Sequence, residues 1–451
     1  MKIIIIGCGT VGFAICEQLS HAGHTITVID EHAPAVAELC NVCDVYGIVG
    51  NGADVSLLRK AGAAGADLLI AATSGDEMNI LACAAAEKLG TKHTVALVRN
   101  PEYTGLVNLL RSDTSLSLTI NPDLAVASEI FRMLRFPSAA KIDTFHRGRV
   151  ELAEFALAPD SPICNVPLLE LRKQMKMNFL VCAVCRGETI YIPSGDFRLL
   201  PGDVIAVTVS EAEITEFFKE IGAYKKPVRD VLITGGGRIT YYLEQMLKKV
   251  KIRSTVIEKD KALCKELAET CSCTVICGDG TKQELLLEEG IEKVDAFLAL
   301  SADDEKNAII SLFAKAHGTK KTVTLISSLS YDVFFKSIGL ESVVSQKNAT
   351  AAEVIRYLRS TASRDDTEIE SLHRLMNERV EAIEFRIKGE IDGITGVPLK
   401  EMRRRAGVLI AAIVRDEEFL LPTGQDRIRP NDSLIVVAQG GVINRIKDIL
   451  S

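Results

Sequence analysis

Short apolar runs alternate with stretches of helical periodicity through the first part of the chain. The first run, Lys2–Ile6, is followed directly by the turn Gly7–Gly12 and then by apolar residues at helical spacing. A second run, Thr25–Ile29, ends in Asp30. This order predicts a strand, a glycine turn, a helix and a second strand that ends in an acid. Such an arrangement is typical of a dinucleotide-binding βαβ unit.

Three further apolar runs continue the alternation at Val45–Val49, Leu68–Ala72 and Thr94–Val98. Strands that are apolar throughout and separated by helices predict a parallel sheet buried on both faces. In such sheets, ligands bind beyond the carboxyl ends of the strands. The polar and glycine residues of this region gather at those ends, which are Gly7, Asp30, Gly50–Gly52, Thr73–Glu77 and Arg99.

The pattern changes after an amphipathic helix that Asn121 opens and that runs to Leu134. Beyond Pro137 the apolar segments are short and β-like, with turn residues between them, and a helix is predicted over Ala212–Lys219. This pattern predicts a small α+β domain. The β-like segments are Val150–Phe155, Phe179–Val184, Thr189–Ile192 and Val204–Thr208.

The whole arrangement repeats, with an offset of 228 residues through the nucleotide-binding part of each half. Gly235–Thr240 matches Gly7–Gly12, and Glu258 stands where Asp30 stood. A common offset across so many positions indicates a tandem duplication of a two-part unit. Further matched pairs are Gly278–Gly280 with Gly50–Gly52, Ser301–Glu305 with Thr73–Glu77, Asn307 with Asn79, and Tyr331 with Tyr103. Later pairs are Glu384-Phe385 with Glu154-Phe155, and Pro430-Asn431-Asp432 with Pro201-Gly202-Asp203.

A chain of 451 residues is too long for one hydrophobic core. The predicted fold class is α/β, with two doubly wound, Rossmann-like parallel-sheet domains that are each followed by a small α+β domain. We expect a nucleotide-binding domain over 1–120, a crossover helix over 121–140 and a small domain over 141–224. The second set is expected over 228–347, 348–378 and 379–451.

Composition restricts the partners. The net charge of −7, from 60 acidic and 53 basic residues, disfavours nucleic-acid binding through a basic field. No apolar run approaches the ~20 residues of a membrane span, and the four isoleucines after Lys2 are too few for a signal peptide. We therefore expect this protein to reach a membrane only through a partner.

The twelve cysteines do not predict a metal site. Cys40/Cys43 and Cys182/Cys185 have CxxC spacing, but zinc needs four ligands brought together by turns. Cys182 and Cys185 lie in an apolar strand, where positions three apart point to opposite faces. Buried or incidental thiols in a reducing, cytosolic compartment are the favoured interpretation, and it extends to the loose group Cys271, Cys273 and Cys277.

The glycine turn predicts how a nucleotide would be held. Gly7 allows the tight turn, Gly9 lets the backbone approach a pyrophosphate, and Gly12 permits close packing of helix on strand. The amides that open the helix favour the phosphate charge. Asp30 could accept hydrogen bonds from ribose hydroxyls and would repel a 2′-phosphate, which favours NAD(H) over NADP(H).

Three other polar residues at the same edge have two interpretations each. Arg99 could bind a phosphate through both ends of its guanidinium, or could simply be solvated. Asp76 and Glu77 could contribute to the site, but N-capping of a helix is slightly favoured.

The second copy departs from the first in two places. Thr240 replaces the third glycine, which looser packing could accommodate, and Ser327 replaces Arg99 and removes a fixed positive charge. We expect the second site to bind nucleotide more weakly, or to bind a less charged one.

The sequence offers no reacting group beside either turn. A dehydrogenase needs a general acid or base next to the nicotinamide. None of the histidines falls in a motif beside a predicted strand end, and the small domains carry no metal-ligand set or nucleophile–base pattern. A sensor is favoured, with a cytosolic NAD-dependent oxidoreductase with a degenerate second half, or a nucleotide-binding scaffold, as alternatives. The histidines are His21, His24, His32, His93, His146, His317 and His373.

The glycine turn with Asp30, the strand ends and the helix from Asn121 together resemble the nucleotide-binding domain of the RCK (KTN) family. The 150–220 and 381–451 segments resemble the RCK C-terminal domain. The doubled order is similar to regulatory subunits of Trk/Ktr-type potassium uptake and covers essentially the whole chain. The resemblance implies a cytoplasmic ring, a homo-oligomer built of dimers or tetramers, peripheral to the inner face of the plasma membrane beneath a TrkH-like potassium transporter subunit. NAD(H), or ATP/ADP at the same sites, would gate transport by changing the shape of the ring.

The same resemblance implies which residues bind nucleotide and which helices pack between units. The helices Ala127–Leu134 and Ala351–Leu358 are candidates for packing against neighbouring units, or else belong to the core of their own chain. The implied first site consists of Gly7, Cys8, Gly9, Thr10, Val11, Gly12, Asp30, Thr73, Ser74 and Arg99. The implied second site consists of Gly235, Gly236, Gly237, Arg238, Ile239, Glu258, Asp279, Leu300 and Ser301.

Overall fold

The structure is a computed structural model of the 451-residue chain, and it separates into two compact units. The first unit joins Met1–Leu134 with Val228–Tyr357, and the second joins Arg135–Pro227 with Leu358–Ser451. Each unit therefore combines matching parts of the two halves of the chain. The structure describes residues 1–20, 23–103, 116–135, 141–146, 149–175, 177–210, 212–224, 226–327, 335, 338–340, 342–362, 367–376, 379–440, 443 and 445–451.

The first half of the first unit is a six-stranded parallel sheet in the order β3-β2-β1-β4-β5-β6. Its central strand is buried on both faces, since Ile3 to Ile6 are at most 2% exposed, as the unbroken apolar run predicts. The strand order reverses between β1 and β4, which is where open α/β sheets bind ligands. The elements are β1 (Lys2–Ile6), α1 (Thr10–Ser20), β2 (Thr25–Asp30), α2 (Ala33–Val42), β3 (Tyr46–Val49), α3 (Val55–Lys60), η1 (Ala63–Gly65), β4 (Leu68–Ala71), α4 (Asp76–Leu89), β5 (His93–Leu97), β6 (Leu118–Ile120) and α6 (Pro122–Arg135).

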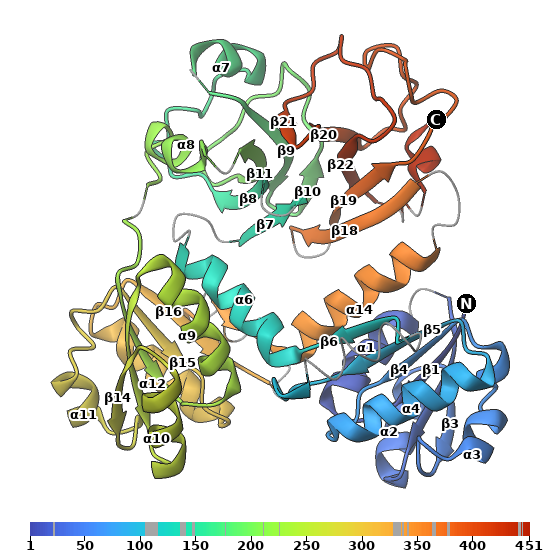
Figure 1. The fold of residues 1–451 in the computed structure, drawn as a ribbon. Helices are drawn as coiled ribbons and strands as arrows, with labels where there is room; N and C mark the ends of the chain where they lie inside the picture. Colours follow the sequence, from blue (N-terminus) through green and yellow to red (C-terminus); the bar gives the residue numbers. More distant parts are fainter. Residues whose placement is uncertain are drawn as a thin grey trace. The chain divides into compact units, whose positions relative to one another are not determined.

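The second half repeats the sheet as β14-β13-β12-β15-β16-β17, again parallel (Figure 1). The two Rossmann-like domains of the predicted fold class are thus confirmed. The elements are β12 (Asp230–Thr234), α9 (Arg238–Val250), β13 (Arg253–Glu258), α10 (Lys261–Thr270), β14 (Thr274–Cys277), α11 (Gln283–Glu288), β15 (Ala296–Ala299), α12 (Asp304–Ala316), β16 (Lys321–Leu325), β17 (Val343–Val344) and α14 (Gln346–Ala362).

The two sheets are tied together by the helices that follow them. Helix α6 leaves the first sheet, yet Val126, Ile130 and Leu134 are buried in one core with Val231 and Leu243 of the second half. Helix α14 reaches the other way, because the Tyr357 hydroxyl lies 3.3 Å from Nδ1 of His93 on β5. The structure therefore confirms the intrachain interpretation for α6. An apolar stripe that does not fit its own sheet is buried by the neighbouring one.

The second unit contains two five-stranded antiparallel sheets of the same topology, β10-β9-β11-β8-β7 and β21-β20-β22-β19-β18. The two sheets share a core in which Phe145 and Leu152 meet Leu375 and Ile435. The elements are β7 (Lys141–Phe145), β8 (Val150–Ala156), α7 (Leu168–Gln174), β9 (Phe179–Arg186), β10 (Thr189–Tyr191), β11 (Val204–Ser210), α8 (Ile214–Glu220), β18 (Thr367–Leu375), β19 (Val380–Ile387), β20 (Val408–Arg415), β21 (Glu418–Leu420), β22 (Ser433–Gln439) and η3 (Ile446–Ile449).

The repeated Pro-x-Asp turn has a structural role in both sheets. Asp203 is 1% exposed, and Arg186 donates to its two oxygens at 2.9 and 2.8 Å. Burial opposes the charge of Asp203, but these bonds and the Leu200 amide lower its pKa below the ordinary value. Arg415 holds Asp432 in the same way, at 2.9 and 2.8 Å. The turn therefore closes each sheet on an ion pair whose carboxylate is buried, and it needs no ligand.

None of the helices in the described ranges combines the length and the apolar character that crossing a membrane requires. The described cysteines carry free thiols, and Cys182 is fully buried while Cys185 is partly exposed. The two therefore differ in environment, as expected for positions three apart on a strand.

The burial of α6 in the core of the second half can be tested by shortening one buried side chain. Ile130→Ala should lower the free energy of unfolding by about 2–5 kcal/mol, because the cavity opens in a core that both halves share. Leu124→Ala on the same helix is the matched control. Leu124 is 39% exposed, so its truncation should cost no more than about 0.5 kcal/mol. Urea unfolding followed by circular dichroism measures the free energy of unfolding of both variants. Equal losses would contradict the burial of α6 in the core of the second half.

Candidate functional site

The first glycine turn is tight at two of its glycines and open at the third. Gly7 has φ of +98°, and a Cβ there would lie 2.7 Å from the carbonyl carbon of Ala72. A Cβ on Gly12 would lie 1.9 Å from the Gly7 oxygen. A Cβ on Gly9 would meet nothing within 4 Å. The fold therefore requires Gly7 and Gly12, whereas Gly9 keeps free a place that a ligand can approach.

The second turn keeps this design with one change. Gly235 has φ of +102° and packs against the backbone of Leu300, and Gly237 is as open as Gly9. Thr240, in place of the third glycine, is fully buried, and its hydroxyl donates to the Gly235 carbonyl at 2.6 Å. The threonine side chain therefore occupies the space between helix and turn, and its hydroxyl bonds the turn.

The acid at the end of each second strand binds backbone amides. Asp30 accepts from Cys8 N at 2.6 Å and from His32 N at 2.8 Å. Glu258 accepts from Gly236 N at 2.6 Å and from Asp260 N at 2.8 Å. A carboxylate has about four acceptor positions, so ribose hydroxyls could still bind. Each acid thus fixes its glycine turn as well as facing the site.

Asn79 fastens the end of β4 to the end of β5. It accepts from the amide and the hydroxyl of Thr73 at 2.9 and 2.7 Å, and it donates to the Leu97 carbonyl at 2.8 Å. Asn307 makes the matching bonds to Ser301 at 3.1 and 2.7 Å and to Leu325 at 3.0 Å. The repeat of these buried asparagines therefore preserves the shape of both strand ends.

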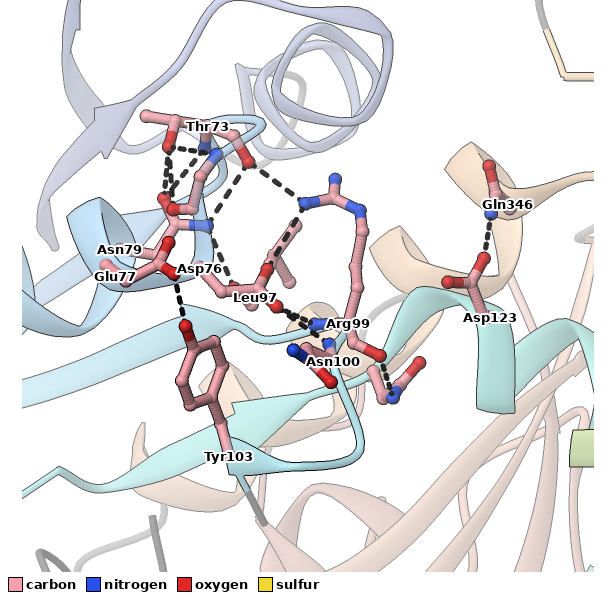
Figure 2. Close-up of polar contacts among 12 residues, drawn as sticks. Thr73, Asp76, Glu77, Asn79, Leu97, Arg99, Asn100, Tyr103, Asp123 and Gln346 are labelled. Carbon is pink, nitrogen blue, oxygen red and sulfur yellow. Dashed lines mark hydrogen bonds and ion pairs between the residues drawn. The ribbon is translucent and has the colours of Figure 1, made fainter. Parts of the chain in front are cut away.

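Asp76 holds Arg99 at the rim of the first site (Figure 2). The Asp76 carboxylate accepts from Arg99 N at 2.9 Å and from Asn100 N at 2.7 Å. The Arg99 guanidinium donates to the Thr73 carbonyl at 3.1 Å and lies 3.8 Å from Asp76. N-capping by Asp76 or Glu77 is wrong: Gly75 precedes α4 without a side-chain cap, and Glu77 accepts from the Tyr103 hydroxyl.

The second site has the same anchor and lacks the cation. Asp304 accepts from Ser327 N at 2.9 Å, just as Asp76 accepts from Arg99 N. This backbone bond at the strand end is therefore shared, but the strand end carries a guanidinium only in the first half, while the second site has Arg238 in its glycine turn. Asp279 is exposed and accepts from the Thr281 hydroxyl at 2.7 Å, while Leu300 is buried behind the turn.

Residues of the second half reach the first site. Asn121 Nδ2 lies 3.1 Å from the Arg99 carbonyl and 2.8 Å from the Tyr242 hydroxyl, which itself donates to that carbonyl at 3.2 Å. Tyr242 lies on α9, which begins at the second glycine turn. The first strand end is therefore bonded directly to the helix of the second site.

Asp123 stands between the two sites and is 6% exposed. Burial raises the pKa of its carboxyl, while Arg238 of the second turn and Arg99 of the first site oppose the rise. Gln346, the first residue of α14, donates to it (Figure 2). One carboxyl thus interacts with both sites and with both crossover helices.

The remaining predicted residues of the turns differ in exposure. Thr10 and Ser74 are exposed at the mouth of the first site, and Arg238 is exposed in the second. Cys8 is buried, and burial with the nearby Asp30 charge raises its thiol pKa to about 12. The Cys8 thiol therefore stays protonated, and its amide is the group that the turn uses.

The domains found by comparison with known proteins follow the two repeated halves of the chain. Residues 3–118 and 231–346 match the TrkA-N domain, and residues 152–222 and 392–451 match the TrkA-C domain. The chain belongs to the TrkA family. A Trk system potassium uptake protein, TrkA homolog 1 of Methanosarcina mazei, is 33% identical over 456 residues and covers 99% of each chain. The TrkA homolog of Archaeoglobus fulgidus is 32% identical over 451 residues and covers 100% of each.

Solved structures show the same fold for the TrkA-family chain. The RCK domain of GsuK has a TM-score of 0.63 at 17% identity, over 97% of this chain and 92% of that one. The GsuK channel bound to NAD has a TM-score of 0.63 at 16% identity, over 97% and 76%. GsuK bound to ADP has a TM-score of 0.51 at 14% identity, over 79% and 69%. The resemblance to tandem RCK domains is confirmed.

The polar network around the TrkA-family sites goes beyond the residues predicted from sequence. Asn79 carried a signal, because Asn307 repeats it at the common offset. Tyr242 had no such signal in the sequence, since its counterpart in the first half is Ala14. Contacts between the two halves, such as those of Asn121 and Asp123, cannot be recognised by comparing the sequences of the two repeated copies.

The role of Thr240 can be tested by removing only its hydroxyl. Thr240→Val should cost about 1–2 kcal/mol in the free energy of unfolding, since the shape is kept and the bond to the Gly235 carbonyl is lost. Thr240→Ser keeps that hydroxyl and serves as the control. Thermal unfolding compares the two, and a serine variant less stable than the valine variant would show that packing alone matters.

Proposed function

We propose that this protein is a nucleotide-sensing regulatory subunit of a membrane potassium uptake system. The observation that carries the proposal is the pair of glycine turns, each open at one glycine and fixed by an acid, at the carboxyl edge of its sheet. Membership of the TrkA family, whose relatives are named potassium uptake proteins, supports the potassium system.

The ligand proposed for both turns is NAD(H), with ATP or ADP as competitors. The open positions at Gly9 and Gly237 admit a pyrophosphate to the backbone. The carboxylates of Asp30 and Glu258 would repel the 2′-phosphate of NADP(H), which favours NAD(H). GsuK bound to NAD and GsuK bound to ADP have the same fold, which supports a site that accepts either nucleotide.

A sensor fits the surroundings of the turns better than an oxidoreductase. Among the described histidines of the first unit, His24 precedes β2, His93 begins β5 and His317 lies between α12 and β16. These positions are at the amino edge of the sheets, opposite the glycine turns. His32 follows β2 and opens α2 beside Asp30, on the adenosine side of a bound dinucleotide.

The proposed signal runs through the contacts between the two halves. A nucleotide phosphate that draws Arg99 toward it would also act on Asn121, Tyr242 and α6. Moving such an equilibrium from 1:99 to 99:1 requires about 5.5 kcal/mol of differential binding. Several sites in a ring of copies could supply that energy together. We therefore include a homo-oligomeric ring, docked on the cytoplasmic side of a TrkH-like subunit, in the proposal.

Calorimetric titration of NADH, NAD, ATP and ADP into the full chain tests the sites. Gly9→Ala should abolish binding at the first turn without unfolding the protein, because a methyl there occupies the ligand's place and touches no protein atom. Gly237→Ala should do the same at the second turn. Full-length variants are needed because α6 and α14 connect the halves. Unchanged binding in both variants would contradict the assignment.

The difference between the two sites can be tested by exchanging one residue. Arg99→Ser should weaken nucleotide binding at the first site roughly 10–100-fold, the value of a charge-assisted hydrogen bond to phosphate. Ser327→Arg is the reciprocal variant and should tighten the second site. Equal affinities of the two sites in the unaltered protein, together with no effect of Arg99→Ser, would show that the cation has no role.

Potassium flux tests regulation itself. Vesicles that contain the transporter subunit and this protein should change their flux when nucleotide is added, and the Gly9→Ala/Gly237→Ala double variant should not respond. Flux that is the same with every nucleotide would favour a scaffold. Steady consumption of NADH with a small-molecule substrate would favour the oxidoreductase.

A further inference from the structure

His146 meets two carboxylates in the second unit, away from both glycine turns. It follows β7 directly, a strand that was not predicted, so this histidine could not be placed at a strand end from the sequence. Its Nδ1 lies 3.2 Å from Oε1 of Glu384 on β19 and 3.9 Å from Oε2 of Glu370 on β18. One donor atom from each of these side chains lies within 4.8 Å of the other two.

Two of the three side chains are shielded from water, and two carboxylates lie beside one imidazole. The side chains of Glu384 and His146 are 3% and 8% exposed, and that of Glu370 is 36% exposed. Even a protonated His146 would neutralise only one of the two carboxylates. Nearby Arg149 binds Glu417 at 2.8 Å. Arg386 donates to the Ser433 hydroxyl at 3.3 Å, and its charge favours the ionised form of Glu370, although burial and the neighbouring Glu384 raise the pKa of Glu370 overall. A bound cation would remove the repulsion between the carboxylates.

Hydroxyl groups behind the carboxylates set their orientation. Ser371 donates to Oε2 of Glu384 at 2.8 Å, which leaves Oε1 directed at His146. Ser433 donates to Oε2 of Glu370 at 3.3 Å. Hydrogen bonds of this kind orient the ligands of metal sites. The imidazole also approaches Glu417, whose Oε1 lies 3.5 Å from Nε2.

The duplicated half shows that the fold itself does not require these residues. Met376 stands at the position of His146, with φ of 52° against 47°. Its amide donates to Glu154 at 2.9 Å, as the His146 amide donates to Glu384 at 3.3 Å. The backbone bond is thus kept while the imidazole is replaced, and the sequence position that matches Glu370 is Ala140. The donor set is therefore an addition to one half.

We infer that His146, Glu384 and Glu370 bind a divalent transition-metal ion of the zinc type, with water completing its coordination. An imidazole nitrogen beside carboxylate oxygens suits zinc and its neighbours, whereas calcium and magnesium prefer oxygen ligands throughout. Two ligands of one zinc ion lie at most about 4.2 Å apart, so the partly exposed Glu370 would move slightly inward. The ion would clamp β7 of one half to β18 and β19 of the other. This inference does not depend on the proposed function.

Zinc titration of the metal-stripped, full-length protein tests the site. We expect one zinc ion per chain, and a loss of affinity of at least about tenfold in Glu384→Gln and His146→Met. His146→Met introduces the residue that the other half already carries there, so the variant should fold. Glu154→Gln alters the matched carboxylate and should leave binding unchanged. Zinc should raise the melting temperature of the unaltered protein and of Glu154→Gln, but not of His146→Met.

Cobalt distinguishes this site from the cysteines. Cobalt(II) at the proposed site should give only weak ligand-field absorption, because no thiolate is bound, and the signal should vanish in His146→Met. Strong sulfur-to-cobalt charge-transfer bands that persist in His146→Met would overturn the assignment. So would an absence of zinc binding, or equal loss of affinity in Glu154→Gln and Glu384→Gln.

Discussion

Helix α6 closes the first half of the chain but is buried in the core of the second, and this placement controls the rest of the first unit. Val126, Ile130 and Leu134 are fully buried there beside strands of the second sheet. The apolar face of α6 would lose its partners if the halves separated, so the two sheets are held as neighbours by the hydrophobic effect. The start of the same helix brings Asn121 and Asp123 between the two glycine turns. A packing requirement thereby creates the polar link between the sites.

The two sites share a backbone design and differ in charge. Asp30 and Glu258 each bind an amide of their glycine turn, and Asp76 and Asp304 each bind the amide at a strand end. These bonds shape the sites, which explains why both copies keep them. The guanidinium of Arg99 does not shape the strand end, because Ser327 occupies the same place without it. The two halves therefore differ by one guanidinium at this strand end, while the second half carries Arg238 in its glycine turn.

Local patterns in the sequence predict the sheets and the turns well. The apolar run before Gly7 and the acid after the second strand depend on residues close together in the chain, and the 228-residue repeat confirms each motif against its copy. The strand β7 was not predicted, because its sequence has neither an apolar run nor a strict alternation of polar and apolar residues. With β7 missing, His146 could not be placed at a strand end.

Long-range contacts could not be predicted for a related reason. Asp76 at the start of a helix looks like a capping acid until the strand end carrying Arg99 is placed over it. Tyr242 has no counterpart in the repeat, and Glu370 and Glu384 meet His146 only through the pairing of two sheets. Each of these depends on packing between segments far apart in the chain, where the hydrophobic pattern fixes burial but not the partner.

A nucleotide bound in the first half should change the conformational stability of the second half. Amide hydrogen exchange of the full chain, with and without NADH, measures this change most directly. The Gly237→Ala variant is used so that NADH binds only at the first turn. We expect slower exchange at Gly7–Gly12 and also along α6 and the start of α9, because Asn121 and Tyr242 both bond to the Arg99 carbonyl. Slower exchange that is confined to the first glycine turn would contradict it.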